Sequence, residues 1–151
     1  MSTGLVVLVV VLVAATAFGV YRRLTDGRIR GVDPRGRPQR KGDRPPADPD
    51  LLTATDLGQP LGERATLVQF STAFCQPCRP TRRVLAEVAE MVDGVTHVDV
   101  DAESHLDLVR RLQVLRTPTV LVLDHDGHVV RRATGVPRRA DVVAALGEAI
   151  P

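Results

Sequence analysis

Two cysteines, the only two in the 151-residue chain, lie three positions apart at Cys75 and Cys78. An apolar run, Leu67–Phe70, precedes them, and apolar residues at helical spacing follow them: Val84, Leu85, Val88, Ala89 and Val92. This pattern predicts a buried strand that passes into an amphipathic helix, with the two thiols at the junction. A helix N-terminus carries free N–H groups and a partial positive charge, which favour the reactive thiolate form. Strand, Cys-x-x-Cys and helix in this order are typical of a redox site.

Two other uses of a Cys-x-x-Cys pair compete with redox chemistry. The pair can form half of a zinc site, but a closed site needs two more Cys or His ligands at suitable spacing. No third cysteine exists, and the histidines show no paired spacing: His97, His105, His125 and His128. A purely structural disulfide is the second alternative, although so short a loop gains little from cross-linking the unfolded chain. The pattern therefore favours a redox pair.

The segment Gly4–Val20 contains no charged residue. As a helix rising about 1.5 Å per residue it spans about 25 Å, at the short end of what crosses a bilayer. Tyr21 is placed as an interfacial aromatic residue. Ala15-Thr16-Ala17 is similar to a signal-peptide cleavage site, but residues 1–3 lack the basic side chains that such peptides normally carry. We therefore predict that residues 1–21 are a retained transmembrane signal-anchor, with residues 4–20 in the membrane.

Residues 22–50 have few apolar side chains and many Arg, Gly, Pro and Asp. Because proline opposes a helix and charge keeps the chain solvated, this segment is predicted to be a linker. It carries nine basic and three acidic residues between Arg22 and Pro46, which anionic lipids would attract. From Ala47 onward there are eleven basic and fifteen acidic residues, so nothing in the folded part indicates a nucleic-acid partner.

Residues 51–151 are predicted to form one compact α/β domain. Leu51–Leu57 is expected to be a short edge strand, and a helix is expected in which Leu106, Val109 and Leu112 share a face. The other expected elements are strands at 65–70, 95–100, 119–123 and 128–133, a hairpin turn at 124–127, and helices from the cysteines to about 92 and from about 137.

The chain from Leu51 to Pro151 resembles the thioredoxin family. The resemblance rests on LVQFSTAFCQPC, a proline two residues after the second cysteine, LRTPTVLVLD, the hairpin at DHDG, and ATG before the last helix. It implies a central mixed sheet flanked by helices, and thiol-disulfide exchange that needs no cofactor beyond the Cys75–Cys78 disulfide. It also implies that Pro118 is in cis and lies against the cysteine pair, while Thr117 offers backbone groups to a substrate strand.

The family pattern is altered at several positions near the cysteines. Phe74 and Ser71 stand where the family commonly has tryptophan, and the spacer is Gln76-Pro77 instead of Gly-Pro. The buried aspartate that relays protons in the family falls on Gln69, and its lysine partner falls on His97. Gln69 cannot take up a proton, although its amide can form hydrogen bonds. By the resemblance, Gln69 and His97 occupy the proton-relay position of the family. The alternative for Gln69 is a polar core residue whose amide is satisfied by hydrogen bonds.

The resemblance assigns a role to each thiol. Cys75 is expected to be the attacking thiolate and Cys78 the buried resolving thiol, with Phe74, Gln76 and Pro77 in the active-site loop. Arg79 and Arg82 either add positive charge near the site or are solvated helix residues. The predicted function is a membrane-tethered thiol-disulfide oxidoreductase, most simply a reductase of protein disulfides fed by an unidentified electron donor. The alternatives are a non-catalytic peptide-binding module and a copper-handling thiol protein.

The charges that flank the apolar segment predict on which side of the membrane the redox domain lies. Within about 15–20 residues of its C-terminal end there are seven arginines, Arg22 to Arg40, and the N-terminal end has no basic side chain. The positive-inside rule then places the redox domain in the cytoplasm, where the thiols would be kept reduced. Many tethered relatives of bacteria work on the outer side, so an extracytoplasmic domain is the alternative.

Overall fold

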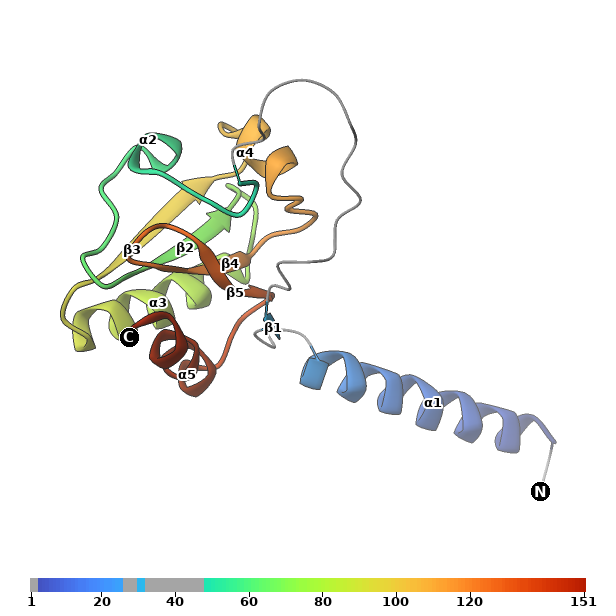
Figure 1. The fold of residues 1–151 in the computed structure, drawn as a ribbon. Coiled ribbons are helices and arrows are strands. Elements are labelled where there is room, and N and C mark those ends of the chain that lie inside the picture. Colours follow the sequence, from blue (N-terminus) through green and yellow to red (C-terminus); the bar gives the residue numbers. More distant parts are fainter. Residues whose placement is uncertain (1–2, 26–29, 32–47) are drawn as a thin grey trace.

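The computed structural model describes residues 3–25, 30–31 and 48–151 (Figure 1). The helices are α1 (Thr3–Thr25), α2 (Ala54–Leu57), α3 (Cys78–Met91), α4 (Leu106–Arg111) and α5 (Arg139–Ala149). The strands are β1 (Arg30–Gly31), β2 (Ala65–Ser71), β3 (Val95–Asp101), β4 (Thr119–Asp124) and β5 (Val129–Thr134). From β2 onward the order is the expected β-α-β-α-β-β-α.

Helix α1 projects away from the rest of the protein (Figure 1). Its segment Gly4–Arg22 has a mean hydropathy of 2.6 and none of it is buried, so by length and composition it is sufficient to cross a membrane. Most of the predicted linker lies outside the described residues. Within it, however, β1 pairs antiparallel with β5, with Arg30 opposite Arg132 and Gly31 opposite Arg131.

The sheet has the strand order β1-β5-β4-β2-β3. Strand β2 runs parallel to β3 and antiparallel to β4, and β4 runs antiparallel to β5, so the sheet is mixed, as predicted. Strand β2 lies inside the sheet, and all seven of its residues are buried. A strand that is covered on both faces carries a continuous apolar run, which is the pattern seen at Leu67–Phe70.

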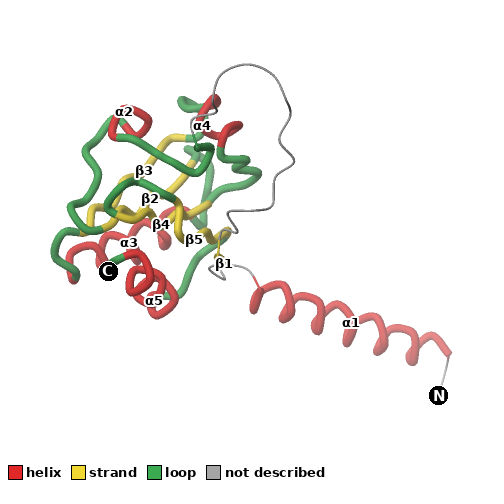
Figure 2. Tube along the Cα trace, viewed as in Figure 1, coloured by secondary structure: helices red, strands yellow, loops and turns green. Residues whose placement is uncertain are grey.

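Alternate residues of the strands pack into two separate cores, as the strand period of two requires. On one face, α3 and α5 cover a cluster that includes Ala65, Leu67, Leu85 and Val142. On the other face, residues from α2 and α4 pack against Val68 and Phe70. The helices are seen on either side of the sheet in Figure 2. Gln69 therefore lies on the β2 face that is covered by α3.

Two local expectations were wrong. Only Leu51 of the predicted edge strand forms a bridge, with His128, and Ala54–Leu57 is a helical turn. The turn is stabilised by a capping box in which Thr53 and Asp56 each bond to the other's backbone N–H. In α4, Leu106 is 53% exposed, whereas Leu108 is buried instead. Because Leu106 begins the helix, the buried face is formed by Leu108 and, one turn later, Leu112.

Candidate active site

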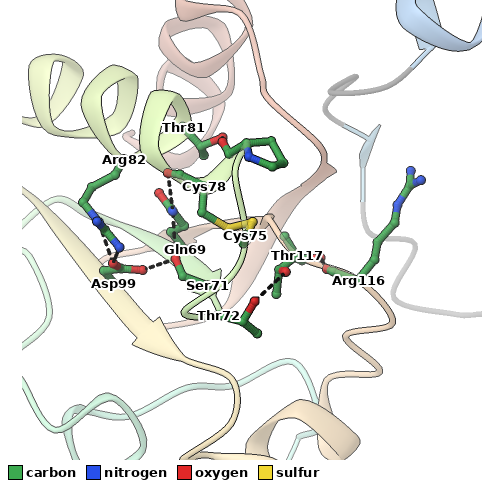
Figure 3. The surroundings of a disulfide bond; sticks show 12 residues. Gln69, Ser71, Thr72, Cys75, Cys78, Thr81, Arg82, Asp99, Arg116 and Thr117 are labelled. Carbon is green, nitrogen blue, oxygen red and sulfur yellow. Dashed lines mark hydrogen bonds and ion pairs between the residues drawn. A yellow bond between two sulfur atoms is a disulfide. The ribbon is translucent and has the colours of Figure 1, made fainter.

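The disulfide between Cys75 and Cys78 lies where β2 passes into α3 (Figure 3). The N–H of Cys75 donates to the carbonyl of Thr72 at 3.3 Å, and the N–H of Cys78 donates to the carbonyl of Cys75 at 3.2 Å. These turns bring the two Cα atoms to 5.4 Å. Helix α3 begins at Cys78, so Cys75 occupies the turn just before the helix. The positive end of the helix dipole is therefore directed at the sulfur atoms.

The two cysteines differ in their exposure to solvent. Cys75 is half-buried, whereas Cys78, the first residue of α3, is only 2% exposed. The neighbours of Cys75 in the loop are exposed: Phe74 at 92%, and both Gln76 and Pro77. An attacking group from another molecule therefore reaches Cys75 more readily than Cys78.

The loop before β4 lies beside the disulfide. The Thr117–Pro118 peptide bond is cis, as the resemblance implied, and Pro118 is buried. Oγ1 of Thr117 lies 3.4 Å from Oγ1 of Thr72, which joins this loop to the turn that holds Cys75 (Figure 3). Leu115 in the same loop is 93% exposed. The only sequence signal for Leu115 is its place three residues before Pro118.

Gln69 is fully buried and lies against the first turn of α3. Its Nε2 donates one hydrogen bond to the carbonyl of Cys78, at 3.0 Å, and a second to Oγ of Ser71, at 2.9 Å. The Ser71 hydroxyl in turn donates to Oδ1 of Asp99 on β3. Oδ2 of Asp99 accepts from Nε of Arg82, which lies on α3, at 2.7 Å. Figure 3 shows this connected set of side chains beside the disulfide.

His97 lies on the same face of the sheet as Gln69, one register position away from it. In the parallel β2–β3 pair, Leu67 is the partner of His97 and Asp99 is the partner of Gln69. Nε2 of His97 is buried without a hydrogen-bond partner, as is Oε1 of Gln69. Burial lowers the pKa of His97, because desolvation disfavours the charged ring; the nearby Asp99 carboxylate opposes this shift. Asp99, rather than His97, is the ionisable residue joined to Gln69 through hydrogen bonds.

Ser71 and Asp99 are parts of this site that were not predicted from the sequence. Ser71 was noted only as the loss of a tryptophan, and Asp99 was not noted. The signal was the alternation along β3, which places residues 95, 97, 99 and 101 on the face toward α3. As to metals, no group of three or more Cys, His, Asp or Glu side chains within the described residues is arranged to hold an ion.

Comparisons with known proteins agree with this geometry. The sequence profile of the thioredoxin family matches residues 53–148. A thioredoxin from Mycobacterium tuberculosis is 32% identical over 103 residues, which are 68% of this chain and 86% of that protein. A thioredoxin from Bacillus subtilis is 32% identical over 88 residues, or 56% of this chain and 84% of that one.

Solved structures give the same result. A crystal structure of chloroplastic thioredoxin z aligns with a TM-score of 0.51 and 27% identity, over 57% of this chain and 78% of that chain. A thioredoxin from Halobacterium salinarum aligns with a TM-score of 0.54 and 19% identity, over 59% of this chain and 77% of that one, and supports the fold alone. With its profile match, its related sequences and its modest but consistent structural likeness, the chain belongs to the thioredoxin family, whose members are thiol-disulfide oxidoreductases.

Proposed function

We propose that this protein is a membrane-tethered reductase of protein disulfides. The observation that carries the proposal is the unequal exposure of the cysteines, with Cys75 accessible and Cys78, at the start of α3, only 2% exposed. A reductase of this kind needs one thiol that reaches its target and a second that is protected until a mixed disulfide has formed.

The reaction transfers two electrons from the dithiol to the target. The Cys75 thiolate attacks one sulfur of the target disulfide, so that a Cys75–target disulfide forms and the first target thiolate leaves and takes up a proton. Cys78 then loses its proton and attacks the Cys75 sulfur. The Cys75–Cys78 disulfide forms and the second target thiol is released. A thiol-containing electron donor returns the pair to the dithiol state.

The loops around Cys75 suit an extended peptide as substrate. Thr117 lies just before β4, with its side chain close to Thr72, and its backbone groups can pair with a substrate strand. Phe74, which precedes Cys75, and Leu115, two residues before Thr117, are 92% and 93% exposed and offer apolar contacts from these two loops. Exposed apolar side chains beside a reactive group favour an unfolded or loosely folded segment of another protein.

We further propose that α1 anchors the protein in a membrane, with the redox domain in the cytoplasm. The support is the mean hydropathy of 2.6 over Gly4–Arg22 and the arginines that follow it in the sequence. In the cytoplasm the thiols are kept mostly reduced, which favours the reductase direction.

Two experiments test these proposals. The full-length protein in detergent micelles should catalyse insulin reduction by dithiothreitol, and the Cys75→Ser variant should lose this activity. A wild-type protein without activity would instead support a non-catalytic binding module. Alkaline phosphatase fused after Pro151 is active only when exported, so a strongly active fusion would place the domain outside and contradict the cytoplasmic assignment.

A further inference from the structure

The residue that faces the buried cysteine from the central strand is neutral. Gln69 can donate hydrogen bonds but carries no charge at any pH near neutrality. Its two amide hydrogens are both used, one on the carbonyl of Cys78 and one on Ser71. The second contact leads to an ionisable group, because the Ser71 hydroxyl donates to the carboxylate of Asp99. The acidic side chain next to the redox pair is thus on β3.

Arg82 completes a ring of contacts. It lies one turn beyond Cys78 on α3, and its guanidinium reaches Asp99 through both Nε and a terminal nitrogen. The ring therefore runs from Cys78 through Gln69, Ser71 and Asp99 to Arg82, and returns to Cys78 along the helix (Figure 3). It joins the first turns of α3 to both parallel strands, and its two charged members are of opposite sign.

Other charged groups near the ring do not replace these two. His97 lies on the same face of β3 as Asp99, but its lowered pKa leaves the imidazole of His97 neutral at pH 7. Asp101 accepts hydrogen bonds from Glu103 and Ser104 at the end of β3. Arg79 on α3 is exposed to solvent. On β2, the ring members Gln69 and Ser71 are both uncharged.

A negative charge near a thiolate opposes its formation, and a positive charge favours it. The side chain of Asp99 is 27% exposed and that of Arg82 is 50% exposed, so their fields are only partly screened by solvent. While they are paired, the two charges largely cancel at the sulfur atoms. Removing either one leaves the other uncompensated, and the two removals have opposite signs.

We propose that Asp99 and Arg82 are positioning residues that set the acidity and reduction potential of the cysteine pair as a balanced ion pair, with Asp99 held next to the site by Ser71 and Gln69. This proposal rests on the thiol chemistry of the proposed function, but it does not depend on the target or on the direction of electron flow. The residues that adjust the thiol pKa in this chain would then be Asp99 and Arg82, and not the buried residue that faces Cys78, which is the neutral Gln69.

The test compares Arg82→Gln, Asp99→Asn and the double variant in the full-length, reduced protein. We expect iodoacetamide to alkylate Cys75 about threefold more slowly in Arg82→Gln and about threefold faster in Asp99→Asn at a pH below the thiol pKa. Threefold corresponds to a shift of about half a unit in the thiol pKa. The double variant should return close to the wild-type rate.

A second readout is the equilibrium with glutathione at a pH where Cys75 is ionised. Asp99→Asn should favour the dithiol about threefold, and Arg82→Gln should favour the disulfide by a similar factor. For a two-electron couple, this is a change of about 15 mV in each direction. Glu87→Gln is the matched control, because Glu87 lies further along α3, where it pairs with Arg139, and its removal should change neither readout.

The opposite signs separate tuning from support of the fold. If the pair only held α3 in place, both single variants would loosen the same turn and shift both readouts in the same direction. That result, or shifts no larger than those of Glu87→Gln, would overturn the proposal. Loss of the proposed reductase function would appear differently, as wild-type protein that fails to reduce insulin while its variants still shift with opposite signs.

Discussion

Nε2 of Gln69 donates a hydrogen bond of 3.0 Å to the carbonyl oxygen of Cys78, nine positions later in the chain. This contact ties the first turn of α3 to the central strand directly beneath the redox pair. The amide is held in one orientation, because its second N–H is bound by Ser71. What faces Cys78 from β2 is thus a hydrogen-bond donor that cannot be ionised.

Gln69→Glu should make both stability and activity depend on pH in a new way. The Cys78 carbonyl is an acceptor, so a carboxylate at position 69 meets it only when protonated, and burial also raises its pKa. The folded protein then binds a proton that the unfolded chain releases near pH 4, so stability falls as pH rises from about 4 to the raised pKa. At pH 7 we expect a loss of about 2 kcal/mol.

Urea unfolding between pH 4 and 8 measures this loss, and insulin reduction over the same range measures the effect on activity. Gln69→Leu is the control, because it removes the same hydrogen bonds without adding a titratable group. It should be less stable than the wild type by an amount that does not change with pH. A Glu variant with the same pH profile as the Leu variant would contradict the prediction.

The exposure of the two cysteines predicts their order of reaction. In the reduced protein near neutral pH, iodoacetamide should label Cys75 at least about tenfold faster than Cys78, because Cys78 is only 2% exposed at the start of α3. Peptide mapping by mass spectrometry identifies the labelled residue. In urea the two rates should become similar. Faster labelling of Cys78 in the folded protein would reverse the roles assigned to the two thiols.

His97 should destabilise the fold when the solution is acidified. Its pKa is lowered by burial, so below pH 6.5 the unfolded chain takes up a proton that the folded protein resists. Stability is therefore lost as pH falls from about 6.5 to the lowered pKa of the folded state. His97→Leu should lack this component in urea unfolding curves. His125→Gln, in the exposed hairpin turn, should keep it; a wild-type pH profile in His97→Leu would exclude His97 as the cause.

The exposed apolar side chains of the loops that carry Cys75 and Thr117 should contribute to substrate binding rather than to folding. Phe74→Ala and Leu115→Ala should each raise KM for insulin several-fold, and should change the free energy of unfolding by less than about 0.5 kcal/mol. Met91→Ala is a suitable control, because Met91 is 55% exposed at the opposite end of α3 from Cys78. An unchanged KM in both loop variants would show that substrates approach Cys75 from another side.

Most of the fold could be predicted from the sequence because its strands and helices carry strong patterns. The buried strand at Leu67–Phe70 and the amphipathic helix after Cys78 both form where the apolar spacing places them. The strand predicted at Leu51–Leu57 was wrong over Ala54–Leu57, because a local capping box formed by Thr53 and Asp56 favours a helical turn over the weak apolar alternation. The prediction that Leu106 is buried was wrong, because the first residue of α4 determines which face of the helix is buried and has no clear signal in the sequence.

The site was only partly predictable from the sequence, because some of its contacts join residues that lie far apart along the chain. The cysteines, the turn between them and the cis bond before Pro118 belong to local motifs. The contact between Ser71 and Asp99 joins residues 28 positions apart and depends on the register of two parallel strands. Register is set by how whole strands pack, so the local sequence around Ser71 does not show which acidic residue it meets.

The pairing of β1 with β5 limits how far the redox site can travel. In the proposed anchored form, the last residue of α1, Thr25, is separated from Arg30 on β1 by five peptide units, which extend to about 18 Å at most. A target disulfide carried by a neighbouring membrane protein would then stay within reach of Cys75, because both proteins are confined to the same membrane surface. A disulfide that diffuses freely in solution does not meet Cys75 more often because of this short connection, so the anchor favours targets at the lipid surface.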